Sequence, residues 1–156
     1  MSTPNVVLCS PVRTAIGTYG GSLKDIPTPT LGSVVIKETV ARAKIDGSAI
    51  DSVVLGQVVQ AGTKMNPARQ AAVEAGVPVT VPALTINRVC GSGAQAIASA
   101  AQEILSGQAD SVIAGGMENM DQSPYLATRG RWGYRMGDAA LYDSMLRDGL
   151  NDAFTD

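Results

Sequence analysis

Apolar, β-branched runs alternate with helix-like segments along most of the chain, and this alternation restricts the possible fold more than any other feature. The runs cover residues 5–12, 51–60, 82–89 and 110–117. Strands that alternate with helices usually pair in parallel, because each helix carries the chain back across the sheet. The sequence therefore predicts an α/β fold, with a mostly parallel mixed sheet and covering helices.

Helix start and stop signals lie between these runs. Residues 28–43 have Thr28 as an expected N-cap, and residues 66–76 begin with Asn66 as an expected N-cap and a proline at the first helical position. A third helix is expected over residues 91–107, which are rich in Ala, Ser and Gly. Small side chains let a helix approach other backbone closely, so this helix is predicted to be buried, either inside the protein or between subunits.

The pattern changes after residue 120. Residues 121–156 hold most of the aromatic residues, and only residues 139–150 have the spacing of an amphipathic helix. We therefore divide the chain into an α/β unit, 1–120, and the incomplete beginning of a second unit, 121–156.

Composition excludes several classes of protein. The 156 residues are 45% hydrophobic and 17% charged, with a net charge of −2. Such a chain can bury a core and offers no basic surface for nucleic acid. No apolar run is long enough to cross a membrane, and the first residues lack the blocks of a secretory signal. A cytoplasmic protein that binds neither nucleic acid nor membrane is expected.

The chain contains two cysteines, Cys9 and Cys90, and no histidine. Two isolated cysteines indicate free thiols in a reducing compartment, and no Cys/His cluster predicts a structural zinc site. Cys9 lies within an apolar run, which predicts a position in the core.

Cys90 has a more specific context, "INRVCGSGAQAIASAAQEIL". The predicted strand delivers the thiol to the carboxyl edge of the sheet, where open α/β sheets bind their ligands. The N-terminus of the following helix favours a thiolate, and its free N–H groups can hold an oxyanion. The pattern predicts a nucleophile; the alternative is a small buried residue at a tight turn.

A nucleophilic cysteine also needs a base or a cation. A helix terminus contributes roughly 0.3–1 kcal/mol, whereas ionising half of an ordinary thiol at pH 7 requires about 2 kcal/mol. Arg88 would share a strand face with Cys90 and could assist as a cation, but arginine cannot act as a base. The base for Cys90 must therefore come from elsewhere.

A second motif overlaps the first. Gly91, Gly93 and Ala96 match the dinucleotide-binding pattern G-x-G-x-x-A, and Glu118 follows the next predicted strand, where it could bind a ribose. The motif lies in the third strand–helix unit, whereas the fingerprint normally occupies the first. Dinucleotide binding is therefore the weakest of the open alternatives.

"NRVCGSG" resembles the nucleophile motif of thiolases, the acetyl-CoA C-acetyltransferases. Further segments that resemble this family are "PVRTAIGTYGGSLKD", "GQVVQAGTKMNPARQAAVEAGVP", "AGGMENMDQSPY" and "RWGYRMGD". Together they cover nearly the whole chain in the family's order, and they are most similar to the branch that forms acetoacetyl-CoA. The alternatives are a related condensing enzyme of the ketoacyl synthase type and a noncatalytic thiolase-like subunit.

The resemblance implies a thiolase-like half followed by the start of an inserted loop domain. It implies condensation of two acetyl-CoA molecules, and the reverse thiolysis, through an acyl thioester on Cys90, whose backbone N–H contributes to an oxyanion hole. Leu150 would contact CoA, and a loop with Arg129, Arg131 and Arg135 would lie near a subunit interface and the CoA phosphates. Coenzyme A and acetyl-CoA would be substrates, with no covalently bound cofactor and no metal.

The family is more than twice as long as this chain. Its second half carries a Gly-His-Pro histidine that activates the nucleophile and a second cysteine that serves as acid and base. The resemblance therefore implies that Cys90 obtains its base from a complementary C-terminal half, that the protein is a homo-oligomer, either dimer or tetramer, and that residues 1–156 alone are inactive.

Overall fold

A three-stranded parallel sheet forms the centre of the structure, a computed structural model that describes residues 5–155. The strands lie in the spatial order β2-β1-β3 and are β1 (Ser52–Gly56), β2 (Ala83–Ile86) and β3 (Val112–Gly116). The register places Gly56 beside Ile86 and Gly116, so the three strands end at one edge of the sheet. The predicted α/β fold with parallel strands is confirmed.

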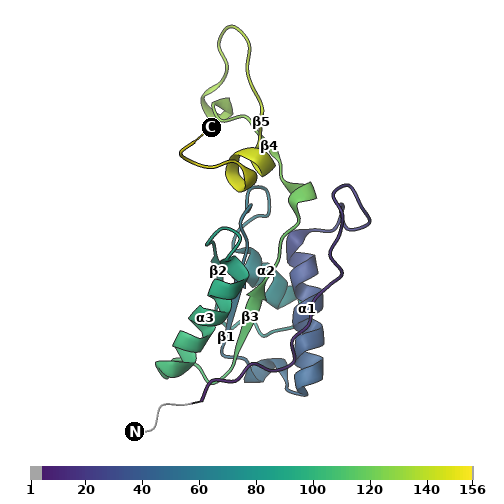
Figure 1. Ribbon diagram of the computed structural model, residues 1–156, viewed down its shortest axis with the longest axis vertical. Helices are drawn as coiled ribbons and strands as arrows, with labels where there is room; N and C mark the ends of the chain where they lie inside the picture. Colours follow the sequence, from purple (N-terminus) through teal and green to yellow (C-terminus); the bar gives the residue numbers. More distant parts are fainter. Residues whose placement is uncertain (1–4, 156) are drawn as a thin grey trace.

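Helices cover both faces of this sheet (Figure 1), and they are α1 (Thr28–Ala43), α2 (Pro67–Glu74) and α3 (Ser92–Leu105). The connection through α2 leads from β1 to β2, and the connection through α3 leads back over β1 to β3. Right-handed crossovers in opposite directions place α2 and α3 on opposite faces. None of the helices in the described residues is long and apolar enough to span a membrane.

The strand β1 is buried along its whole length because helices pack on both of its faces. Val53 and Leu55 belong to the main core, which also contains Ile36 of α1 and small residues of α2. Alternate residues of a strand point to opposite faces, so Gly56 faces α3 instead. The core therefore fixes β1 in a position where its last residue meets α3.

The helix signals in the sequence were correct for α2 and wrong in one detail for α1. The Asn66 side chain accepts a hydrogen bond from the Arg69 N–H at 3.2 Å and caps α2 as predicted. The N-cap of α1 is Pro27, and Thr28 is already the first helical residue. Thr28 is 1% exposed and packs into the protein rather than closing the helix end.

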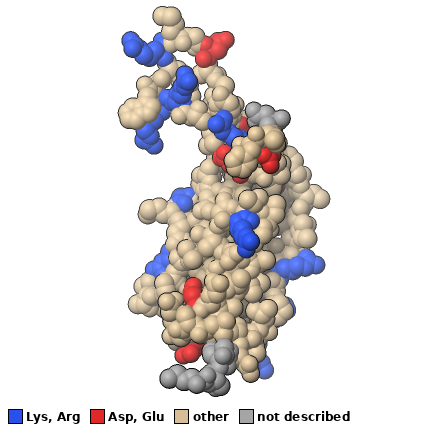
Figure 2. Space-filling model, turned by 60° about the vertical axis from the view of Figure 1, so that its left-hand side comes forward, with Lys and Arg blue, Asp and Glu red and all other residues tan. Residues whose placement is uncertain are grey.

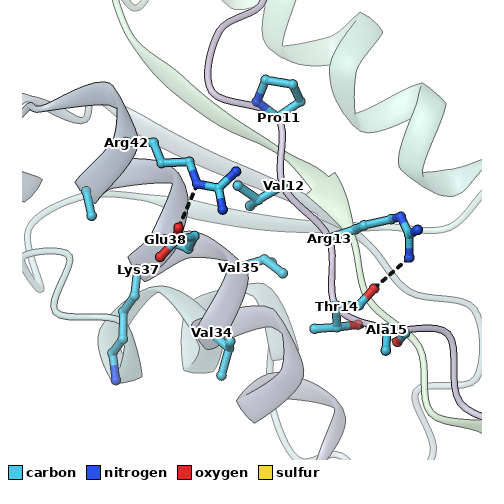
Figure 3. A pocket seen from close by; sticks show the side chains of 11 residues that line it. Pro11, Val12, Arg13, Thr14, Ala15, Val34, Val35, Lys37, Glu38 and Arg42 are labelled. Atoms are coloured by element: carbon cyan, nitrogen blue, oxygen red, sulfur yellow. Dashed lines mark hydrogen bonds and ion pairs between the residues drawn. The ribbon is translucent and has the colours of Figure 1, made fainter.

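The first apolar run does not form the predicted strand. Residues 5–12 have no regular secondary structure, and Val7 and Leu8 are each 76% exposed. Cys9 is exposed, so its predicted place in the core is wrong. An open groove of about 1130 Å³ separates residues 11–15 from α1 (Figure 3). The run makes no backbone ladder with β3, which leaves its apolar side chains uncovered.

The last part of the chain projects away from the sheet (Figure 1). It contains a short antiparallel pair, β4 (Tyr125–Leu126) with β5 (Tyr142–Asp143), and a π-helix, Leu146–Leu150. The single helix predicted over 139–150 is therefore wrong. The N–H and the hydroxyl of Ser144 both donate to the Pro124 carbonyl, at 3.2 and 2.6 Å, and tie the residue that follows β5 to the residue that precedes β4.

Short 3-10 turns complete the described part of the chain, at Gly47–Ala49, Met120–Gln122 and Gly130–Trp132.

The α3 helix is less buried than its small residues suggested. Only Ser92, Ala96 and Ala100 are buried, whereas Ile97 is 38% exposed and Leu105 is 47% exposed. One face of α3 packs on the sheet, and its opposite face is open.

Candidate active site at the carboxyl edge of the sheet

A cavity of about 240 Å³ lies where the three strands end. Its walls come from the ends of β1 and β3, the turn before α3 and the π-helix. Cys90 and Leu150, two residues that the sequence singled out, both line this cavity although they are far apart in the chain. The structure thus brings a thiol and an apolar side chain together at the edge where the sequence predicted a site.

Cys90 lies at the tip of a tight turn that joins β2 to α3. The Gly91 N–H donates to the Arg88 carbonyl at 3.1 Å, and the Ser92 N–H donates to the Val89 carbonyl at 3.0 Å. Val89 has a φ of 50°, a left-handed conformation that is unfavourable for a β-branched residue. This turn presents the Cys90 side chain on the surface, next to the N-cap of α3.

Ser92 holds the turn from the helix side. Its hydroxyl accepts a hydrogen bond from the Arg88 N–H at 2.8 Å and donates one to the Val89 carbonyl at 2.6 Å. Ser92 is only 4% exposed, and both of these bonds are partly buried. Nothing in the sequence pattern predicted this role, apart from the position of Ser92 two residues after the cysteine.

Three glycines let the start of α3 lie directly on the strand ends. A Cβ at Gly56 would come 2.5 Å from the carbonyl carbon of Ser92, and a Cβ at Gly116 would come 3.2 Å from the Cα of Gly93. Any larger residue at position 56 would push the helix start away from the sheet. The close approach therefore sets where Cys90 stands relative to the cavity.

The backbone around Cys90 can stabilise negative charge. Its own N–H has no hydrogen-bond partner within residues 5–155, and the first turn of α3 contains no acidic residue. Free N–H groups at a helix start favour anions, and N–H groups aimed at a developing oxyanion stabilise it. The Cys90 N–H can therefore stabilise the oxyanion that forms when an acyl group is transferred to or from this residue.

The cation predicted for Cys90 is not arranged as the sequence suggested. β2 ends at Ile86, so Arg88 and Cys90 do not share a strand face. The Arg88 guanidinium instead donates to the Gln95 side chain of α3 at 2.5 Å. Within residues 5–155 no hydrogen bond links the thiol to a side chain that could act as its base, and no group of His, Cys, Asp and Glu in this part of the chain is arranged to hold a metal.

Glu118 is the ionisable residue that shares the cavity with Cys90. Burial raises the pKa of its carboxyl, while hydrogen bonds from the Val58 and Val59 N–H groups act in the opposite direction. These bonds measure 2.7 and 3.4 Å and both end on Oε2. The carboxyl is thus bound to backbone of its own chain, which argues against the ribose-binding role considered for it.

The three arginines lie away from this cavity. Arg129, Arg131 and Arg135 are exposed on the loop between β4 and β5, and none of them lines the cavity. Figure 2 shows Lys and Arg side chains gathered on this projecting part. Within residues 5–155 the ion pair that forms, between Arg42 and Glu38, belongs to α1. The structure therefore separates the arginines from Cys90 and Leu150.

Comparison with known proteins identifies the family. A family model described as the thiolase N-terminal domain matches residues 6–156. An acetyl-CoA acetyltransferase from Cupriavidus necator is 51% identical over 150 residues, which are 96% of this chain and 38% of that protein. An acetyl-CoA acetyltransferase from Pseudomonas aeruginosa is 51% identical over 152 residues, 97% of this chain and 39% of that protein. The chain therefore spans less than half the length of these relatives, and it belongs to the thiolase family.

Proposed function

We propose that this chain is the amino-terminal part of an acetyl-CoA C-acetyltransferase. The reaction is the condensation of two acetyl-CoA molecules to acetoacetyl-CoA and CoA, together with the reverse thiolysis. The observation that carries the proposal is the position of Cys90, an exposed thiol whose own backbone N–H is free, beside a cavity at the carboxyl edge of the sheet. The names of the two relatives agree with this reaction.

The first step forms a thioester on the protein. The Cys90 thiolate attacks the carbonyl carbon of acetyl-CoA, the bond from that carbon to the CoA sulfur breaks, and CoA leaves with a proton. A thiolate suits this step because it is both a strong nucleophile and a good leaving group. The free N–H of Cys90 supplies part of the oxyanion hole for the tetrahedral intermediate.

The second step forms a carbon–carbon bond. A second acetyl-CoA loses a methyl proton to a base, and the carbanion attacks the carbonyl carbon of the Cys90 thioester. The carbon–sulfur bond to Cys90 breaks, which releases acetoacetyl-CoA and regenerates the thiol. Because the chain has no histidine, the bases of both steps are assigned to the part of the protein beyond these residues.

That remaining part is the proposed partner. Residues 1–120 would be the α/β half of the enzyme, and residues 121–156 would begin its loop domain. Exposed apolar side chains along residues 5–16 and the groove beside α1 offer surface for further chain. We propose that the complete protein is a cytoplasmic homo-oligomer, a dimer or tetramer, of lipid metabolism; its two free cysteines suit a reducing compartment.

The arginine loop is proposed to act in the complete protein only. Arg129, Arg131 and Arg135 would lie near a subunit interface and the phosphates of CoA, since guanidinium groups bind phosphate well. Replacing all three by Gln should raise KM for acetyl-CoA and weaken the dependence of KM on salt. A matched change at Arg147, which lies over the Tyr142 ring at 4.6 Å, should leave that dependence unchanged.

Intact-mass measurement of the complete protein after mixing with acetyl-CoA tests the mechanism. One acetyl group should be gained, and Cys90→Ser should abolish the gain together with turnover. Cys9→Ser is the matched control, since Cys9 is also an exposed thiol but lies outside the cavity. Residues 1–156 alone should show no turnover.

The same experiment distinguishes the proposed function from a noncatalytic subunit and from a ketoacyl synthase. A complete protein that is never acetylated, or that keeps its adduct and turnover in Cys90→Ser, would refute the proposal. Folded, unacetylated protein without turnover would indicate a noncatalytic subunit. Acetylation that requires an acyl carrier protein would indicate a ketoacyl synthase.

A further inference from the structure

The turn that carries Cys90 contains an unfavourable backbone conformation that must be held from outside. Val89, directly before the cysteine, has a φ of 50°. A β-branched side chain in the left-handed region crowds its own backbone, so such a residue persists only where its surroundings restrain it. Ser92 restrains the turn from the side of α3. A second restraint comes from the side of the sheet.

Asn87 provides the first link of that second restraint. Its Oδ1 accepts a hydrogen bond from the Val89 N–H at 2.8 Å. Its Nδ2 donates to the Val58 carbonyl at 3.3 Å. Asn87 therefore ties the residue with the unfavourable φ to the segment that follows β1.

Glu118 provides the next link. Its Oε2 accepts the Val58 N–H at 2.7 Å and the Val59 N–H at 3.4 Å. The same peptide segment is thus held by Glu118 through its N–H groups and bound by Asn87 through its carbonyl. Glu118 follows β3 and Asn87 follows β2, so the links join the ends of all three strands below the turn.

We propose that Glu118 is a positioning residue for Cys90, which acts through Val58 and Asn87 on the conformation of Val89. The inference rests on the proposed function, because it assigns the restraint to the acetylation of Cys90. Glu118 would not exchange a proton with substrate. It would hold the peptide segment that aligns the thiol with the cavity and aligns the free Cys90 N–H with the developing oxyanion.

A matched control exists at the opposite edge of the same two strands. The Asp51 carboxylate accepts the Asp110 and Ser111 N–H groups at 2.8 and 3.0 Å, and so joins the start of β1 to the start of β3. Asp51 and Glu118 make the same kind of connection between segments at β1 and β3. Only Glu118 is linked to the cysteine turn, so Asp51→Ala controls for a general loosening of the sheet.

The test compares Glu118→Ala, Glu118→Gln, Asn87→Ala and Asp51→Ala in the complete enzyme. Single-turnover acetylation of Cys90, its alkylation rate with iodoacetamide, kcat, KM and the melting temperature are measured. Because small displacements of a reacting group cost large factors in rate, Glu118→Ala and Asn87→Ala should each slow acetylation by about tenfold. KM should change much less than kcat. Glu118→Gln keeps an acceptor for the Val58 N–H and should recover most of the rate.

Asp51→Ala should lower the melting temperature without slowing acetylation. The proposal is overturned if Asp51→Ala slows acetylation as much as Glu118→Ala, if Glu118→Gln is as slow as Glu118→Ala, or if Asn87→Ala reacts at the wild-type rate. Iodoacetamide needs no CoA and separates this inference from the proposed function. Loss of acetylation in the unchanged enzyme refutes the function, whereas slower alkylation in both Glu118→Ala and Asn87→Ala still supports the positioning role.

Discussion

Gly56, the last residue of β1, lies directly against Ser92, the first residue of α3. A Cβ at position 56 would approach the Ser92 carbonyl carbon to 2.5 Å and its Cβ to 2.6 Å. Backbone cannot move aside as a flexible side chain can, so the contact leaves no room for any other residue. The absence of a Cβ at Gly56 therefore allows β1 and α3 to approach this closely. This approach fixes the position of the Cys90 turn relative to the sheet.

Gly56→Ala should therefore displace the start of α3. Overpacking of this kind typically costs about 1–3 kcal/mol, so the free energy of unfolding should fall by that amount and acetylation of Cys90 should slow. Gly115→Ala is the control within the same sheet, because the nearest atom to its Cβ would be Leu55 Cδ2 at an ordinary 3.8 Å. Equal unfolding and acetylation in the two variants would show that the contact does not constrain the site.

Ser92→Ala tests the restraint on the helix side. Loss of the hydroxyl leaves the Arg88 N–H without its partner in a partly buried position, which should cost about 1 kcal/mol in denaturant unfolding. Ser106→Ala, at the other end of α3, removes only a bond from an exposed hydroxyl to the Glu103 carbonyl. That control should change stability by about 0.5 kcal/mol or less. A similar loss in both variants would assign no special role to Ser92.

The sequence was sufficient to predict the parts of the fold that depend on local signals. Asn66 caps α2 as predicted, and the residues that end the predicted ranges 66–76 and 91–107 are glycines with positive φ, Gly76 at 91° and Gly107 at 74°. The first run failed because its strand character depends on a neighbour. Val7 and Leu8 have strand-forming side chains, but no strand pairs with them in the described chain. Pairing is a property of the whole sheet, and a local pattern cannot report it.

In the candidate site too, the sequence predicted the features that depend on local signals and not those that depend on contacts in space. Cys90 was found from the sequence because the strand, the glycines and the helix are adjacent to it in the chain. Asn87, Ser92 and Gly56 were missed because their roles depend on contacts in space, such as the approach of β1 to α3. Glu118 was considered as a ribose-binding residue because it follows β3. The hydrogen bonds from the Val58 and Val59 N–H groups show instead that its carboxyl binds the segment after β1.

Leu150→Ala should weaken substrate binding in the complete enzyme. Leu150 is 61% exposed and lines the cavity with Cys90, so a bound acyl-CoA would cover part of its side chain. Losing that apolar contact is worth about 1 kcal/mol, which should raise KM for acetyl-CoA about fivefold and leave kcat nearly unchanged. Leu146→Ala, in the same π-helix but outside the cavity, should leave KM unchanged. A fall in kcat alone would contradict a binding role for Leu150.

The carboxyl groups at the two ends of β1 and β3 have pKa shifts of opposite sign. Hydrogen bonds from the Ser111 and Asp110 N–H groups lower the pKa of Asp51. Burial raises the pKa of Glu118, against the bonds from Val58 and Val59. A lowered pKa means that the unfolded chain binds more protons, so the stability from Asp51 is complete above the ordinary aspartate pKa and is lost as the pH falls through the lowered value. A raised pKa means that the folded chain binds more protons, so Glu118 costs stability as the pH rises through the raised value.

Urea unfolding of the complete enzyme over a range of pH should separate these two groups. Asp51→Asn should flatten the loss of stability on the acid side, because the variant has no proton to bind there. Glu118→Gln should remove the decline on the higher-pH side, because an amide stays neutral where the carboxyl ionises. If Asp51→Asn instead changed the higher-pH side, or Glu118→Gln the acid side, the two carboxyl groups would have the reverse shifts, and the hydrogen bonds at Asp51 and the burial at Glu118 would not be their causes.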